Sequence, residues 1–115
     1  MSPGTGEDKR KSVRIPVQLT VRYEIGGQQL SGTALNLSAD GIFLKSAEIL
    51  RQDDRIEIVL DLSDSRSLKI PSRVIWAQWI DGVGTPTAGM GVQFEYAQPS
   101  DRDLINSFIH HLMGN

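Results

Sequence analysis

Residues 15–27 read IPVQLTVRYEIGG, and this stretch decides how the chain can fold. Its apolar residues recur at every second position, as Val17 and Leu19 do, with polar or charged residues between them. A period of two is typical of a β-strand with one buried face. The pair Gly26-Gly27 then suits a two-residue hairpin turn, because glycine tolerates the positive φ angles that such turns need. The sequence therefore predicts a strand that turns back at this glycine pair.

The same period continues along most of the chain. Further short apolar or alternating runs occupy residues 29–37, 42–45, 56–62, 68–76 and 90–96, separated by polar, glycine-rich or proline-containing turns. About six strands at this spacing favour a small antiparallel barrel, because closing the sheet removes its exposed edges. Only the C-terminal segment has helical spacing, and its apolar positions are Leu104, Ile105, Phe108, Ile109 and Leu112. The predicted fold is mostly β, a six-stranded antiparallel barrel with a C-terminal α-helix.

Two local features are predicted from the same patterns. Ser100, with Asp103 three residues later, is expected to begin the helix as a capping box. Trp76 is expected on the buried face that Val74 shares, and Trp79, three residues further on, falls on the opposite face of a regular strand. One indole is therefore predicted in the core and the other at the surface.

Composition limits the class of protein. The 115 residues are 39% hydrophobic and 23% charged, as expected for one soluble domain. We expect a flexible leader over residues 1–8 and the domain over residues 9–115. No apolar stretch approaches the roughly 20 residues that span a bilayer, and the start of the chain does not have the apolar core of a signal peptide, so no membrane insertion and a cytoplasmic location are predicted.

Several functions are excluded by what the sequence does not contain. There is no cysteine, so disulfides, thiolate metal sites and cysteine nucleophiles are ruled out. No GxSxG, Walker or HExxH motif occurs, and we expect no catalytic residues, no metal site and no cofactor. The formal net charge of -2 argues against duplex nucleic acid as a partner, which usually requires a basic excess.

Two short motifs remain. Arg10 and Arg14 form an RxxxR pattern just before the first strand, and Asn36, Ser38 and Gly41 form an NxSxxG pattern between the second and third. In this order, about 20 residues apart, on this strand pattern, they resemble the PilZ domain, a receptor for the bacterial second messenger cyclic di-GMP. The resemblance covers roughly residues 8–112 and implies a ligand site made of these five residues.

The chemistry of the ligand fits these residue types. Cyclic di-GMP carries two phosphates and two guanines, and a planar arginine side chain can stack on a purine or donate two hydrogen bonds to guanine or phosphate. Asn36 can pair with a guanine edge, the Ser38 hydroxyl can bind a base or phosphate, and Gly41 allows a positive φ or a close approach of ligand. The expected mechanism is closure of the Arg10–Arg14 loop over the ligand and signalling to a protein partner that the sequence does not identify.

Neighbouring charged residues receive secondary assignments. Lys9 and Lys11 are predicted to contact phosphate or guanine. In the PilZ family the position before the first arginine is associated with binding one ligand or an intercalated pair; the basic Lys9 favours the pair, although the stoichiometry stays open. Asp40 lies outside the predicted site, because a carboxylate beside two phosphates is repulsive.

Two other functions stay open at this point. The first is a PilZ-like module that binds proteins without any ligand, although such divergent family members generally lack the arginine motif. The second is a barrel that binds single-stranded nucleic acid through aromatic side chains and an arginine arm. Its steeply salt-dependent affinity for oligonucleotides would distinguish it from a receptor for a cyclic dinucleotide.

Overall fold

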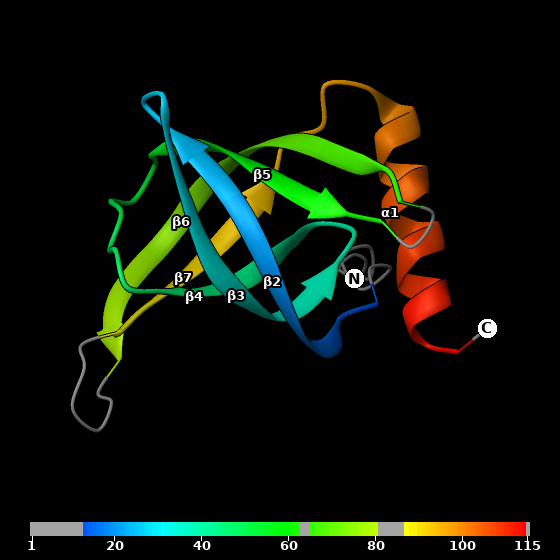
Figure 1. Cartoon of the computed structure of the whole chain (residues 1–115), viewed down its shortest axis with the longest axis horizontal. Helices are drawn as coiled ribbons and strands as arrows, with labels where there is room; N and C mark the ends of the chain where they lie inside the picture. The colour runs from blue at the N-terminus through cyan, green and yellow to red at the C-terminus, as the bar shows by residue number, and fades with distance from the viewer. Residues whose placement is uncertain (1–12, 63–64, 81–86, 115) are drawn as a thin grey trace, which may run out of the picture.

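The computed structural model describes residues 13–62, 65–80 and 87–114 (Figure 1). Within them, strands form a closed antiparallel barrel in the order β2-β3-β4-β7-β6-β5, followed in the chain by one helix. Their bounds are β2 (Ile15–Ile25), β3 (Gln28–Ser38), β4 (Gly41–Ser46), β5 (Arg55–Asp61), β6 (Ser67–Ile80), β7 (Thr87–Phe94) and α1 (Pro99–Leu112). The predicted six-stranded barrel with a C-terminal helix is confirmed.

The first hairpin forms as its sequence predicts. On β2, Val21 and Tyr23 are buried whereas Arg22 is exposed, so the period of two separates core from solvent. Gly26 and Gly27 have φ angles of 57° and 81°, which place both turn residues in the left-handed region. The turn therefore sets the register in which β2 pairs with β3.

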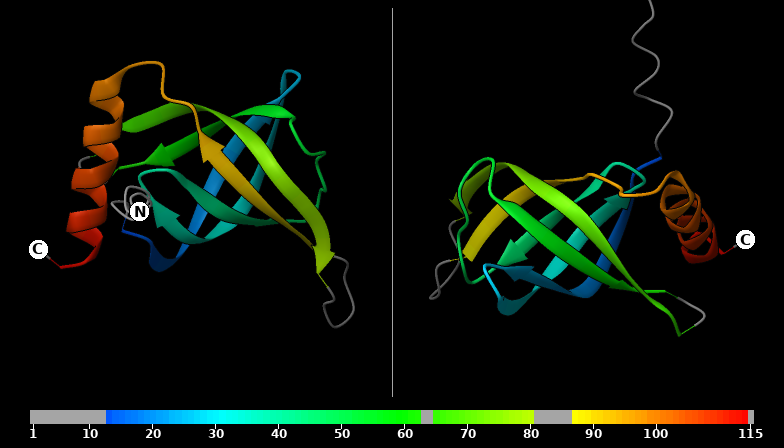
Figure 2. Two further views of the ribbon diagram at one scale, coloured as in Figure 1. Left: turned by 180° about the vertical axis from the view of Figure 1, so that it is seen from behind. Right: turned by 90° about the horizontal axis from the view of Figure 1, so that it is seen from above.

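Helix α1 stands across one end of the barrel (Figures 1 and 2). It buries Ile105, Phe108 and Ile109, three members of the predicted apolar stripe. The predicted capping box is wrong: the helix begins at Pro99, and no side chain caps its N-terminus. Proline is favoured at the first helical position because its fixed φ suits a helix and its missing N–H is not needed there.

The path of β6 differs from the sequence prediction. The pairing of β6 with β7 shifts register between Val74 and Trp76, which is the mark of a β-bulge. After the shift Trp76 lies on the outer face of the barrel, 42% exposed, and Trp79, near the end of the strand, is 53% exposed. The prediction that one indole lies in the core is therefore wrong, because the extra residue turns Trp76 outward.

The last strand of the chain lies in the middle of one wall. β7 pairs with β4 on one side, from Gly41–Gln93 to Ser46–Ala88, and with β6 on the other. Figure 2 shows these three strands side by side on the back of the molecule. Residues that are far apart in the sequence are thereby brought together on this wall.

Candidate functional site

A hollow of about 460 Å³ opens on the outer wall formed by β4, β7 and β6, and we call it the outer pocket. This volume is within the range of small-molecule sites. It is lined by residues of the two sequence motifs and by aromatic, apolar and amide side chains from the wall. Its lining consists of Arg14, Asn36, Asp40, Gly41, Ile42, Phe43, Ile75, Trp76, Gly91, Val92 and Gln93.

The two motifs meet at a hydrogen bond. Arg14 Nη1 donates to Asn36 Oδ1, and the backbone N–H of Phe43 donates to the same oxygen at 3.1 Å. The Asn36 side chain is thus oriented by β4, and its acceptor is occupied by an arginine in this conformation. Lys9, Arg10 and Lys11 lie outside the described residues. The structure therefore brings Arg14, Asn36 and Gly41 together among the predicted site residues.

Ser38 and Gly41 are set by the local backbone. The Ser38 side chain is buried, with 1% of the residue exposed, and its Oγ accepts from the Asp40 N–H at 3.1 Å. The hydroxyl shapes the turn between β3 and β4 and does not line the outer pocket in this conformation. A Cβ on Gly41 would lie 2.0 Å from the Val92 carbonyl oxygen of β7. Gly41 is thus required for the close approach of two strands.

An aromatic surface forms one side of the outer pocket. The rings of Phe43 and Trp76 lie with centroids 5.6 Å apart, tilted by 30°. The Trp76 indole lies against the backbone of β7, since a Cβ on Gly91 would come within 2.2 Å of Nε1. The two sequence motifs do not include Phe43, Trp76 or Gly91. The signal that could have found them is glycine at alternate positions 89 and 91 of a strand, which indicates a close approach by another group.

The turn beside the pocket is also tied to the C-terminal part of the chain. Asp40 Oδ1 accepts from Arg102 Nη2 of α1 at 2.9 Å, forming an ion pair. Tyr96 OH donates to the Ala39 carbonyl oxygen at 2.6 Å. Burial raises the pKa of Tyr96, so its phenol stays protonated and keeps this role as donor.

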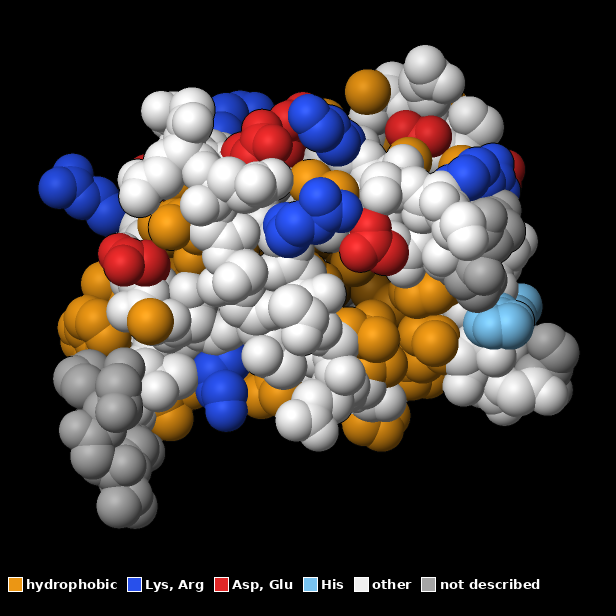
Figure 3. Space-filling view, in the orientation of Figure 1, with side chains coloured by type: hydrophobic (Ala, Val, Ile, Leu, Met, Phe, Trp, Pro, Cys, Tyr) orange, Lys and Arg blue, Asp and Glu red, His pale blue; other side chains and the backbone are white. Residues whose placement is uncertain are grey.

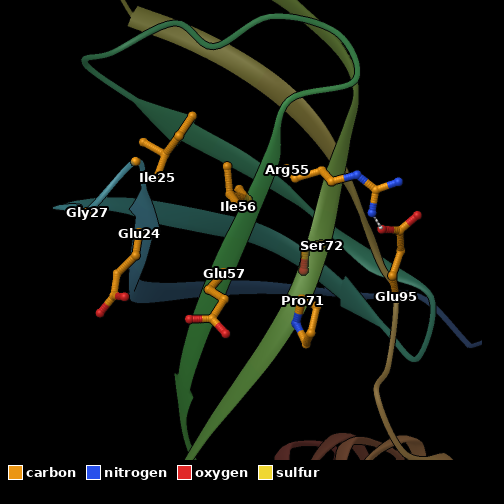
Figure 4. A pocket seen from close by; sticks show the side chains of 10 residues that line it. Glu24, Ile25, Gly27, Arg55, Ile56, Glu57, Pro71, Ser72 and Glu95 are labelled. Atoms are coloured by element: carbon orange, nitrogen blue, oxygen red, sulfur yellow. Dashed lines mark hydrogen bonds and ion pairs between the residues drawn. The ribbon is translucent and has the colours of Figure 1, made fainter.

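A second hollow, of about 330 Å³, lies near the β2–β3 hairpin (Figure 4). Its lining includes Glu24, Glu57 and Glu95, and Arg55 Nη1 is already paired with Glu95 Oε1 at 3.1 Å. Figure 4 shows the Glu24 and Glu57 side chains projecting together from neighbouring strands. An excess of carboxylates disfavours an anionic ligand there, so the outer pocket is the better candidate for one.

The described part of the chain also bears on metal, membrane and duplex nucleic-acid sites. It contains no group of three or more histidine, cysteine or acidic residues arranged to hold a metal ion. None of its helices has the length and apolar character needed to cross a membrane. On the face in Figure 3, basic and acidic side chains are interspersed and form no continuous basic stripe. This face does not have the charge pattern of a surface for duplex nucleic acid.

Fold and pocket together define a small barrel domain with a C-terminal helix and a ligand-sized hollow on its outer wall. A family profile described as the PilZ domain matches residues 8–111, nearly the whole chain. The chain belongs to the PilZ domain family. No curated protein matches it in sequence.

Solved structures share this fold. The inhibitor of motility MotI/DgrA from Bacillus subtilis has a TM-score of 0.70 and 17% identity, covering 93% of this chain and 52% of its own. The PilZ domain of YcgR from Escherichia coli, solved with c-di-GMP, has a TM-score of 0.67 and 15% identity, covering 90% and 94%. The PilZ domain of CeSA from a cellulose-synthesizing bacterium has a TM-score of 0.64 and 21% identity, covering 88% and 98%. The chain spans about half of the MotI/DgrA chain and matches the isolated PilZ domains over nearly their full length.

Proposed function

We propose that the chain is a receptor for cyclic di-GMP that binds this ligand in the outer pocket. The observation that carries the proposal is the meeting of Arg14, from the RxxxR motif, with Asn36, from the NxSxxG motif, beside an exposed indole. A similar fold, the PilZ domain of YcgR, has been solved with c-di-GMP. The proposal includes no catalytic step.

Each side chain has a part in this binding. Arg14, with Arg10, supplies a planar cation that stacks on guanine or donates a bidentate pair to guanine or phosphate. Trp76 offers an aromatic face to a base, a contact typically worth about 1–3 kcal/mol. Asn36 hydrogen-bonds a guanine edge, and Ser38 and Gly41 hold the turn that closes the pocket, with the Ser38 hydroxyl available to ligand only if this turn opens. Lys9 and Lys11 contribute secondary contacts to phosphate or guanine.

The conformational response begins at Arg14. Its guanidinium hydrogen-bonds Asn36 Oδ1 in the structure, an acceptor that a guanine N–H would also use. Binding therefore exchanges the Arg14–Asn36 hydrogen bond for contacts between each side chain and the ligand. The Arg10–Arg14 segment closes over the ligand in this step and presents an altered surface to a protein partner.

Calorimetry with cyclic di-GMP tests the receptor proposal. The folded wild type is expected to bind at about micromolar affinity or tighter, because ordering the arginine segment opposes binding. Arg10→Ala and Arg14→Ala are each expected to weaken binding by at least about tenfold, the loss of a charge-assisted contact. Arg22→Ala is the matched control, since Arg22 pairs with Asp61 away from the outer pocket. No heat of binding at tens of micromolar ligand would refute the receptor proposal.

The conformational response needs its own measurement. In Trp79→Phe, Trp76 is the remaining tryptophan, and its fluorescence reports on the outer pocket. Cyclic di-GMP is expected to change this emission with the affinity found by calorimetry, and Arg14→Ala is expected to shift the titration to higher ligand concentration. A pull-down from lysate with and without ligand then tests whether a partner is bound in a ligand-dependent way. Stronger, salt-dependent binding of single-stranded oligonucleotides, with no preference for the cyclic dinucleotide, would favour the nucleic-acid alternative.

A further inference from the structure

Asp40 brings a carboxylate to the outer pocket, where the proposed ligand brings two phosphates. Its backbone is held on both sides: the N–H donates to Ser38 Oγ at 3.1 Å, and the carbonyl accepts from the Phe94 N–H at 2.8 Å. With the backbone fixed in this way, Asp40 stays at the edge of the outer pocket, and the direction of its carboxylate depends on the side-chain torsions and on the partners of the carboxylate. A phosphate in the outer pocket therefore meets whatever net charge this side chain carries.

That charge is balanced by α1. Arg102 Nη2 lies 2.9 Å from Asp40 Oδ1, and the two side chains are 42% and 48% exposed. A half-exposed pair of this kind contributes little to fold stability. Its effect on an approaching anion is larger, because the carboxylate with its guanidinium is neutral as a pair, whereas the carboxylate alone repels. The nearby hydrogen bond from Tyr96 to Ala39 keeps the turn and the segment leading to α1 together.

We propose that Arg102 is a positioning residue for the outer pocket, which neutralises and orients Asp40 so that a phosphate of cyclic di-GMP can bind beside it. This inference rests on the proposed function and assigns a role in it to α1, which contributes no residue to the pocket lining and acts through the contact of Arg102 with Asp40. A protein partner that draws Arg102 away from Asp40 therefore lowers the affinity for the ligand. Because coupling between two binding sites is reciprocal, bound ligand weakens the binding of that partner by the same factor.

A double-mutant cycle measured by calorimetry with cyclic di-GMP tests this role. Arg102→Gln is expected to weaken binding about three- to tenfold, an effect that shrinks as salt is raised from about 50 to 500 mM. Asp40→Asn in the same chain is expected to restore the affinity, because it removes the negative charge, and Arg102→Lys is expected to retain most of the affinity, because it keeps a cation beside Asp40. Arg55→Gln is the matched control, since it removes an exposed ion pair with Glu95 outside the outer pocket.

Each outcome decides between structural and electrostatic roles. Unchanged affinity in Arg102→Gln overturns the inference, and so does a double variant that binds as weakly as Arg102→Gln alone. Asp40→Asn by itself is expected to bind at least as tightly as wild type, which keeps the inference falsifiable even if Arg102→Gln does not fold. A wild type that does not bind cyclic di-GMP overturns the proposed function and this inference together, whereas a wild type that binds without this pattern overturns the inference only.

Discussion

Gly91 is the position where the smallest change disturbs the aromatic side of the outer pocket. In Gly91→Ala the new Cβ would lie 2.2 Å from Trp76 Nε1, whereas ordinary contacts begin near 3.4 Å, so the indole must move by about 1.2 Å. Because the indole is partly exposed, it can tilt outward, and we expect a cost of about 1–2 kcal/mol to the free energy of unfolding. Part of this cost is masked by the gain of roughly 0.5–1 kcal/mol that alanine brings to a strand by restricting the unfolded chain.

The displaced indole is expected to weaken cyclic di-GMP binding about tenfold, consistent with the loss of one stacking contact. Thermal unfolding measures the stability term, and calorimetry measures the affinity. Trp76→Ala removes the obstacle, so adding Gly91→Ala to it is expected to lower neither stability nor affinity further.

Gly89→Ala serves as a graded comparison for Gly91→Ala. It inserts the same methyl group on the same face of β7, where the nearest atoms are Ile80 Cδ1 at 2.4 Å and Phe43 Cζ at 3.0 Å. Because Phe43 also lines the outer pocket but Trp76 is not contacted, Gly89→Ala is expected to weaken binding less than Gly91→Ala does. The reasoning is refuted if Gly91→Ala binds as tightly as wild type. It is also refuted if Gly91→Ala weakens binding equally in the Trp76→Ala background.

Three further predictions concern the fold that holds the site. Gly41→Ala places a Cβ 2.0 Å from the Val92 carbonyl oxygen, a backbone atom that cannot yield, and is expected to lower the free energy of unfolding by more than about 2 kcal/mol in chemical denaturation. Ser46→Ala leaves the buried hydroxyl of Tyr23 without its partner at 2.7 Å and is expected to lower the free energy of unfolding by about 1–3 kcal/mol. Adding Tyr23→Phe in the same chain is expected to recover most of this loss, and additive losses would contradict the prediction. Burial raises the pKa of Tyr96 above its ordinary 10.0, so the contribution of the Tyr96 phenol to stability is complete below pH 10 and declines as pH rises further. Tyr96→Phe is expected to flatten this alkaline decline in the free energy of unfolding. An equally steep decline in the variant would disprove this prediction.

The strands and the core positions could be predicted from the sequence because alternation is a local signal. Val21 and Tyr23 are buried where a period of two places them, and the glycine turn fixes the partner strand. Trp76 was misplaced because one extra residue in β6 reverses every following side chain, and a bulge leaves no reliable trace in the alternation. Such an insertion depends on how β6 meets β7, which is a property of the assembled sheet.

In the candidate site, too, the residues of local motifs could be predicted, whereas those brought together by strand pairing could not. Arg14 and Asn36 were predicted from motifs, and the structure joins them by a hydrogen bond although 22 residues separate them. The glycines at positions 89 and 91 indicate a close approach to β7, but the identity of the side chains that approach it, Phe43 and Trp76, depends on how β4 and β6 pair with β7. Asp40 was left out of the predicted site because of its negative charge. Its partner Arg102 on α1 lies 62 residues away in the chain, so no local pattern indicates this ion pair.

The placement of β7 between β4 and β6 also has a consequence for protein synthesis. A growing polypeptide leaves the ribosome with its arginine and asparagine motifs first, but the wall that carries the outer pocket is complete only when the last strand has emerged and inserted. Under the proposed function, a chain that ends before β7 is therefore not expected to bind cyclic di-GMP, because it lacks the central strand of this wall.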